Sequence, residues 1–157
     1  METHDPLEPT EITFLLGMAF QLVLSEFVSR LDAAGYAELR PMHGLVFQVL
    51  QGPGATSSEL AEQLGVTKQA AGQIIDDLEK RGYVERQPHP AGGRRKLVVL
   101  TTKAKEHLAV AGRVLHGLEA QLTKQLHEVG LEVPRAELAA IIRTLAGDSI
   151  PPLRPVW

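Results

Sequence analysis

The stretch from Thr56 to Gln87 has the sequence TSSELAEQLGVTKQAAGQIIDDLEKRGYVERQ and contains two short helical patterns followed by the start of a strand. Thr56 and Glu59 have the spacing of a capping box, and Gly65 stands where the first helix would end. Thr67 can cap the second helix. Apolar residues recur at helical spacing in both patterns, which predicts one buried face on each helix. The residues of these faces are Leu60, Ala61, Leu64, Ala71, Ile74, Ile75 and Leu78. Two short helices joined by such a turn predict a helix-turn-helix.

The outward face of the second helix is polar and has few bulky side chains. It carries Lys68, Gln69, Gly72 and Gln73. A major groove about 12 Å wide admits one helix, and the side chains that meet base edges there are polar. Gln can pair with adenine and Lys with guanine, while the helix N-terminus at Thr67 favours a phosphate. This face therefore predicts base contacts, without deciding which residue contacts which base.

The same helix carries acidic residues farther along, at Asp76, Asp77 and Glu79. We expect these carboxylates to repel phosphate, so that DNA contact is confined to the N-terminal half of the helix. For the helix pair alone, an ordinary solvated helix surface remains the alternative.

A basic hairpin follows the helix pair. Residues 83–87 and 97–100 have the pattern of two short strands around the loop PHPAGGRRK, whose prolines and glycines suit an exposed turn. The loop ends in Arg94, Arg95 and Lys96. A basic hairpin in this place is a wing that can reach the adjacent minor groove or the DNA backbone, because arginine favours narrow minor grooves.

The charge of the chain is unevenly distributed. The net charge is −3, but residues 66–105 hold nine Lys and Arg against four acids, a local charge of +5, which leaves −8 for the rest. A basic segment between acidic flanks is expected where one surface meets a polyanion. A solvated charged surface is the alternative explanation.

Long amphipathic helices flank the helix pair. The first runs from Thr10 to Leu31, with Gly35 as its stop, and its apolar stripe is wide enough to pack on a second subunit as well as on its own domain. A shorter helix from Pro41 ends before GPG at residues 52–54. After residue 101 a long helix continues to Gly130, and a last helix runs from Pro134 to Gly147.

The predicted fold class is mostly α with a small β-hairpin: a winged helix-turn-helix domain between long N- and C-terminal dimerisation helices. We expect a single domain over residues 1–157. Its parts are helical dimerisation elements at 10–34 and 103–147, the winged helix-turn-helix at 38–101, and an irregular tail at 148–157.

With these features the chain resembles the MarR (multiple antibiotic resistance regulator) family of transcription regulators. The resemblance rests on SELAEQLGVTKQAAGQIIDDLEKRGYVERQPHP, on GGRRKLVVLT leading into TKAKEHL, and on the long flanking helices, so it covers nearly the whole chain. It implies a homodimer in which the first and last helices interlock and the two winged domains meet a pseudo-palindromic operator in double-stranded DNA. It also implies control of nearby genes, often by a repressor that a small aromatic or anionic effector releases.

The residue pattern and the resemblance to the family together give the predicted DNA-binding residues. The first helix of the pair adds Ser57 and Ser58, which stand near its start and can meet phosphate. Wings of the family commonly carry an Asp two residues before the Arg that falls at Arg94, where this chain has Gly92. We therefore expect a more mobile wing, in which neighbouring cations share the contact. The full set is Ser57, Ser58, Thr67, Lys68, Gln69, Gln73, Arg94, Arg95 and Lys96.

The effector site is expected where the dimerisation helices meet the winged domain. Phe20, Met42, His43 and Phe47 can supply apolar walls and one polar group, although plain core packing is the alternative for all of them except His43. The six histidines have no pair at the i, i+4 spacing of a helical metal site, so we predict no metal, with a site formed where His43 approaches His107 or the first helix as the alternative. Solvated or singly hydrogen-bonded histidines are expected instead. The sequence shows no cofactor signature, so we predict no cofactor.

Composition limits the other functions. Cysteine is absent, which removes disulfides, thiolate metal sites and thiol redox switches and fits a cytoplasmic protein. The N-terminus lacks a signal-peptide pattern, and no window approaches 18 consecutive apolar residues, so we expect no membrane span. Catalytic groupings and phosphate-binding glycine loops are missing from the sequence, so we predict no enzyme. The competing function is a winged-helix protein-interaction module that does not bind DNA.

Overall fold

The computed structural model describes residues 5–154, which form two compact units that divide between Glu38 and Leu39. In the first unit, α1 (Ile12–Leu31) continues into the π-helical turn η1 (Asp32–Tyr36). Gly35 has φ +101°, a conformation that glycine adopts without strain, so the helix ends where the sequence predicted.

Apolar side chains cover much of α1 and stay exposed in the single chain. Ile12, Phe14 and Leu22 are each more than half exposed. The segment Ile12–Tyr36 also contains an 18-residue window with a mean hydropathy of 1.7, so it is long and apolar enough to cross a membrane by length and composition alone. A helix that packs in a subunit interface meets the same criterion, because both environments remove apolar side chains from water.

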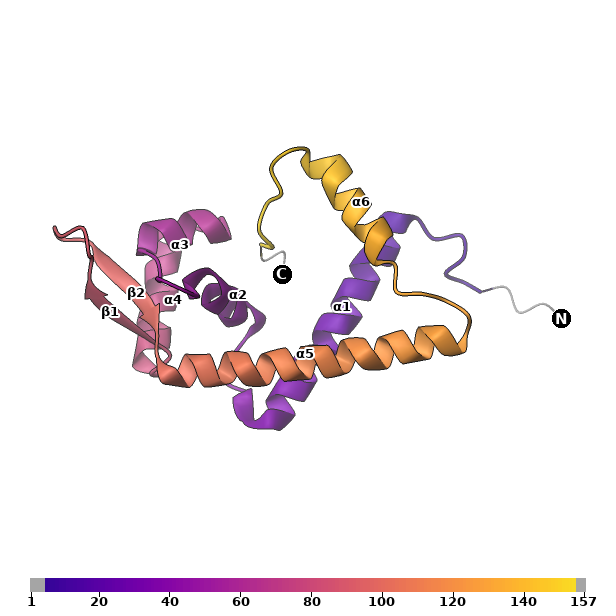
Figure 1. Cartoon of the computed structure of the whole chain (residues 1–157), viewed down its shortest axis with the longest axis horizontal. Helices are drawn as coiled ribbons and strands as arrows, with labels where there is room; N and C mark the ends of the chain where they lie inside the picture. Colours follow the sequence, from indigo (N-terminus) through magenta and orange to yellow (C-terminus); the bar gives the residue numbers. More distant parts are fainter. Residues whose placement is uncertain (1–4, 155–157) are drawn as a thin grey trace. The chain divides into compact units, whose positions relative to one another are not determined.

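The second unit contains the remaining elements (Figure 1). In chain order they are α2 (Pro41–Leu50), α3 (Ser57–Leu64), α4 (Lys68–Lys80), β1 (Val84–Pro88), β2 (Lys96–Leu100), α5 (Thr102–Glu128) and α6 (Arg135–Ala146). Figure 1 shows α3, α4 and the hairpin gathered at the N-terminal end of the long helix α5. The winged helix-turn-helix fold with a long helix after the wing is confirmed.

The hairpin is antiparallel, and Val84 pairs with Leu100 in its register. Ala55 adds a third chain segment on the other side of β2, with hydrogen bonds of 3.1 Å and 2.8 Å between the backbones of Ala55 and Val98. The sequence analysis did not predict this bridge. It placed both strands within one residue of their observed bounds, and Tyr83, expected at the start of the first strand, is instead a fully buried core residue.

The core lies between α2, α3, α4, the inner face of the hairpin and the first turns of α5. The buried faces of α3 and α4 agree with the prediction except at Ile74, which is only partly buried. The residues with almost no exposure are Val46, Phe47, Leu50, Leu60, Ala71, Ile75, Leu78, Tyr83, Val98 and Ala104.

Candidate nucleic-acid interface

The turn between α3 and α4 sets the direction of α4. Gly65 ends α3 in the left-handed conformation, with φ +68°. Two residues later the Thr67 hydroxyl accepts a hydrogen bond from the Ala70 N–H at 3.0 Å and caps α4. Ala71 and Ile75 then anchor the inner face of α4, which turns the opposite face outward.

The predicted base-contacting residues lie on that outward face. Lys68, Gln69 and Gln73 are exposed, while Gly72 between them adds no side chain. At the start of the bracing helix α3, Ser58 is exposed and Ser57 is partly buried. The structure thus gathers the polar residues of α4 on one surface, in a form that a groove can accept.

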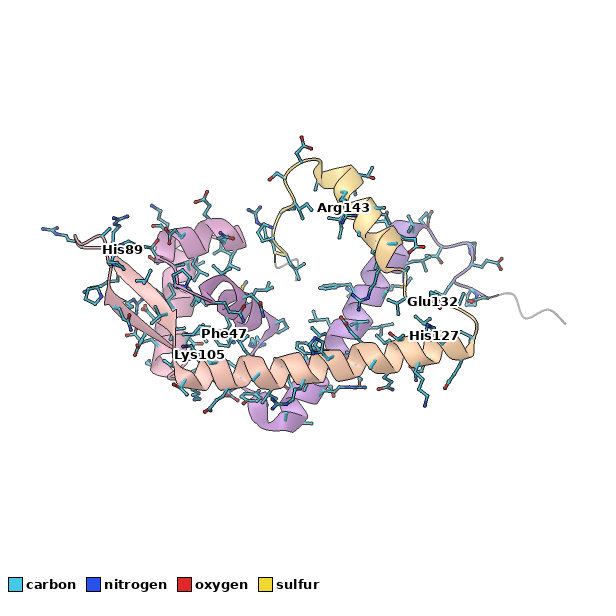
Figure 2. The ribbon with its side chains drawn as sticks, viewed as in Figure 1. Phe47, His89, Lys105, His127, Glu132 and Arg143 are labelled. Carbon is cyan, nitrogen blue, oxygen red and sulfur yellow. The ribbon has the colours of Figure 1, made fainter. Side chains whose placement is uncertain are left out.

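The wing is built on a turn that His89 holds. Its Nδ1 accepts a hydrogen bond from the Ala91 N–H at 3.0 Å, and its carbonyl oxygen accepts one from the Gly92 N–H at 2.8 Å. Gly92 has φ +78°, so a residue with a side chain would be strained at this position. The sequence analysis missed this role of His89, although a polar side chain just before PAGG is a typical turn signal. Figure 2 labels His89 beside the hairpin.

The wing cations Arg94, Arg95 and Lys96 are all exposed. Arg95 and His89 also lower the pKa of the Glu59 carboxyl, although the hydrogen bond from the Thr56 backbone is the largest cause of that shift.

The acids of α4 are paired within the domain. The Arg86 guanidinium donates to Asp76 Oδ1 and to Glu79 Oε2, both at 2.6 Å. Asp77 Oδ1 accepts a hydrogen bond from Arg81 Nε at 3.0 Å. We expected these carboxylates to repel phosphate. The pairing weakens this repulsion, because a cation at hydrogen-bonding distance cancels much of each charge, and the confinement of DNA contact to the N-terminal half of α4 stays a prediction.

The start of α5 fastens the end of α4. The Thr101 hydroxyl donates to the carbonyl of Gly82 at 2.7 Å, and Lys103 Nζ donates to the carbonyl of Arg81 at 2.8 Å. The same ammonium lies 4.4 Å from the centre of the Tyr83 ring, a cation–π contact. A movement of α5 would therefore be transmitted to the C-terminal end of α4.

The effector candidates do not form one site in the second unit. Phe47 is fully buried, with ring centres 5.6 Å from Tyr83 and 5.5 Å from His107, as in an ordinary core (Figure 2). Met42 is partly exposed, and Phe20 belongs to the first unit. An open cavity of about 620 Å³ lies elsewhere, between the hairpin and the start of α5. The effector site therefore stays a prediction.

His43 has a defined structural role at the start of α2. Its Nδ1 accepts a hydrogen bond from the Arg40 N–H at 2.9 Å, and its Nε2 lies 3.7 Å from Asp77 Oδ2. Burial lowers the pKa of the imidazole, and the nearby charge of Asp77 opposes this shift only in part. His43 is thus held as a neutral acceptor that caps the helix.

The other histidines fit no metal site. His107 is buried in the core, so it is not one of the solvated rings that were expected, whereas His127 Nε2 lies 2.7 Å from Glu132 Oε2 just beyond α5 and makes the expected single hydrogen bond (Figure 2). Across residues 5–154, no three His, Asp or Glu side chains gather in a way that could hold a metal ion.

The chain is similar in sequence and in fold to proteins that are already known. Residues 39–95, which span α2 to the wing, match the model of the MarR family. The chain aligns over 87% of its length, with 26% identity and a TM-score of 0.68, to 92% of the transcriptional repressor CouR bound to a 23-mer DNA duplex. The winged domain therefore matches the MarR family in sequence, and the fold is that of solved MarR-family transcription regulators.

Further proteins are similar to this chain in fold or in sequence. The Multiple Antibiotic Resistance Repressor, MarR, has the same fold, with a TM-score of 0.66 and 23% identity over 88% of this chain and 96% of that one. The uncharacterized HTH-type transcriptional regulator YcgE of Bacillus subtilis (strain 168) is 32% identical over 78 residues, which are 50% of this chain and 51% of YcgE. The chain spans about half the length of the first curated relatives that it matches. The family consists of transcription regulators.

Proposed function

We propose that this protein is a cytoplasmic homodimer of the MarR family that binds double-stranded DNA at a pseudo-palindromic operator and represses transcription until a small effector releases it. One observation carries the proposal: the exposed polar start of α4 stands beside an exposed basic wing, in the segment with a local charge of +5. A surface of this kind combines base contacts with attraction to phosphate.

The DNA contacts divide into three groups. Lys68, Gln69 and Gln73 contact base edges from α4, and the wing cations contact the minor groove or its phosphates. Ser57, Ser58 and Thr67 lie at the starts of α3 and α4, where hydroxyl and backbone N–H groups suit phosphate. The CouR complex with DNA supports this arrangement, because CouR shares the fold at 26% identity.

The dimer rests on the apolar side chains that the single chain leaves in water. Leu22 of α1 and Leu145 of α6 are 72% and 82% exposed, far more than a stable monomer is expected to leave on two helices. A second copy of the chain would cover them, with 10–34 and 103–147 as the dimerisation elements and 38–101 as the DNA-binding part. The apolar character of α1 then reflects a subunit interface and no membrane span.

The effector is the least specified part of the proposal. A structure of CouR from Rhodococcus jostii RHA1, 20% identical to this chain, holds p-coumaroyl-CoA, which combines an aromatic group with anionic phosphates. We infer a small aromatic or anionic effector, with Phe20, Met42, His43 and Phe47 as candidates for its site.

Substitutions on the two DNA-contacting elements test the proposal. Arg94→Ala should weaken binding to all DNA sequences and lower the dependence of log K on log salt by about 1, because one phosphate contact is lost. Gln69→Ala should reduce the preference for the operator over a scrambled duplex by about 1–3 kcal/mol. Lys124→Ala, an exposed lysine on α5, is the control and should change neither quantity. If these substitutions abolished binding to a protein partner and left DNA binding unchanged, the result would instead support the competing function, a winged-helix protein-interaction module that does not bind DNA.

A further inference from the structure

Arg86 is not one of the proposed DNA-contacting residues, but it forms a contact within the winged domain. It lies on β1, the edge strand of the small sheet, and its two terminal nitrogens reach two different carboxylates of α4. The partners Asp76 and Glu79 are three residues apart, so they lie on the same face of α4. One side chain of the wing thus binds two residues of α4, the proposed recognition helix.

This contact differs from a single ion pair because one guanidinium is bound by two carboxylates, of which Asp76 is 69% and Glu79 43% exposed. Both distances are 2.6 Å, and the Arg86 side chain is only 32% exposed. Burial works against the charge, but the hydrogen bonds and charges of the two carboxylates outweigh it and raise the pKa of the guanidinium. A planar guanidinium held by two carboxylates is fixed in orientation, which a single flexible pair is not.

The contact also lies on the outer, exposed part of the hairpin, whose inner face packs in the core. Residues 85–88 of β1 are exposed along their length, and the partner strand β2 is held on its other side by Ala55. Within residues 5–154, Arg86 forms ion pairs that join the hairpin to α4. Both ends of the guanidinium are already engaged, so Arg86 is not arranged to contact phosphate.

We propose that Arg86 is a positioning residue that locks the wing onto the recognition helix, so that both reach DNA in a fixed relative orientation. The proposal rests on the proposed DNA-binding function. Without the lock, the basic tip of the wing would sample many positions and would lose freedom on each binding event, which lowers affinity without removing a DNA contact.

The lock can first be tested in the protein without DNA. Hydrogen exchange followed by mass spectrometry should show faster exchange in peptides covering residues 84–100 of the Arg86→Gln variant, with α2 unchanged. Arg113→Gln on α5 is the matched control, because it removes an exposed arginine outside the winged domain. Equal exchange in the wings of wild type and Arg86→Gln would overturn the proposal.

DNA binding then tests the consequence. With duplex from upstream of the protein's own gene, Arg86→Gln should bind roughly two- to tenfold more weakly than wild type, with an unchanged salt dependence. A salt slope reduced by about 1 would show a direct phosphate contact and contradict the positioning role. If wild type binds no DNA, the proposed function itself fails. If wild type binds and Arg86→Gln binds equally well, only the role of Arg86 fails.

A triple variant separates position from charge. Arg86→Gln together with Asp76→Asn and Glu79→Gln removes the cation and both carboxylates, so no unpaired acid is left to repel phosphate. If Arg86 only neutralises these acids, the triple variant should bind DNA at least as tightly as wild type. The proposed lock predicts that the triple variant binds DNA as weakly as Arg86→Gln and shows the same fast hydrogen exchange in the wing. The single variant Arg86→Lys should recover part of the affinity.

Discussion

His43 links the stability of the winged domain to pH through one buried ring. Its Nδ1 accepts the Arg40 N–H, and burial lowers the pKa of the imidazole below its ordinary value of 6.5. Below pH 6.5 the unfolded chain therefore binds a proton that the folded protein does not. The free energy of unfolding should fall as the pH drops from 6.5, and this effect should level off below the folded pKa.

The variant His43→Gln should remove this dependence. Urea unfolding of both proteins between about pH 7.5 and 5 would measure it, since histidine titrates in this range. The difference in the free energy of unfolding between wild type and His43→Gln should be largest at pH 7.5 and should shrink toward pH 5. A constant difference would show that His43 takes no part in the pH dependence.

Among the glycines, Gly54 has the least room for a side chain. Its φ is +84°, and a Cβ there would lie 2.3 Å from the carbonyl oxygen of Val98. Gly54→Ala should therefore disrupt the bridge to β2 and destabilise the domain by more than about 2 kcal/mol, since strain and steric overlap combine. Gly52→Ala is the matched control, because Gly52 has φ +81° with open space around it and should lose only about 1 kcal/mol. Equal midpoints of urea unfolding for the two variants would contradict the steric argument.

At the scale of the elements, the capping box of α3 depends on an ionised Glu59. Its carboxylate accepts the Thr56 N–H at 2.8 Å, and hydrogen bonding to Thr56 lowers the pKa of this carboxyl below 4.5. A lowered folded pKa contributes stability that is complete above pH 4.5 and is lost as the pH falls through the folded pKa. Glu59→Ala should thus destabilise the domain at pH 7, and less in acid.

Unfolding curves of wild type and Glu59→Ala at pH 7 and at about pH 3 would measure this difference. The two free energies of unfolding should approach each other at the lower pH. A gap of the same size at both pH values would mean that Glu59 acts through packing and that its charge contributes nothing.

Sequence predicted the elements wherever their determinants are local. The caps at Thr56 and Thr67 and the stop at Gly65 follow from residues three or four apart, and all three are confirmed. Ala55 was missed because its pairing with Val98 joins residues 43 positions apart, and no local pattern marks it. Strand pairing depends on the fold as a whole, so propensity alone does not reveal it.

In the candidate site, too, local features could be predicted from the sequence and long-range contacts could not. Exposure of Lys68, Gln69 and Gln73 could be predicted, because a helix with one apolar face must turn its polar face outward. The pairing of Arg86 with the acids of α4 could not, since it joins a strand to a helix. The pairing lowers the net charge near these acids, while their effect on phosphate stays a prediction.

At the scale of the whole molecule, the apolar surface of the flanking helices is best explained by a second copy of the chain. Leu145→Glu would place a charge in the proposed interface, where its desolvation is costly, and should shift the protein from dimer to monomer. Thr144→Glu is the control on the neighbouring, exposed polar position. Sedimentation velocity at micromolar concentration would separate the two states. A dimer unaffected by Leu145→Glu would exclude the C-terminal end of α6 from the interface.

The central claim is that the surface formed by α4 and the wing recognises DNA by sequence. Fluorescence anisotropy with labelled duplex from upstream of the protein's own gene, against a scrambled duplex, tests it most directly over about 50 to 200 mM salt. We predict tighter binding to the native duplex and an affinity that falls by orders of magnitude over this range, because several phosphate contacts release counterions. Weak binding to both duplexes, with no difference between them and little dependence on salt, would contradict the claim.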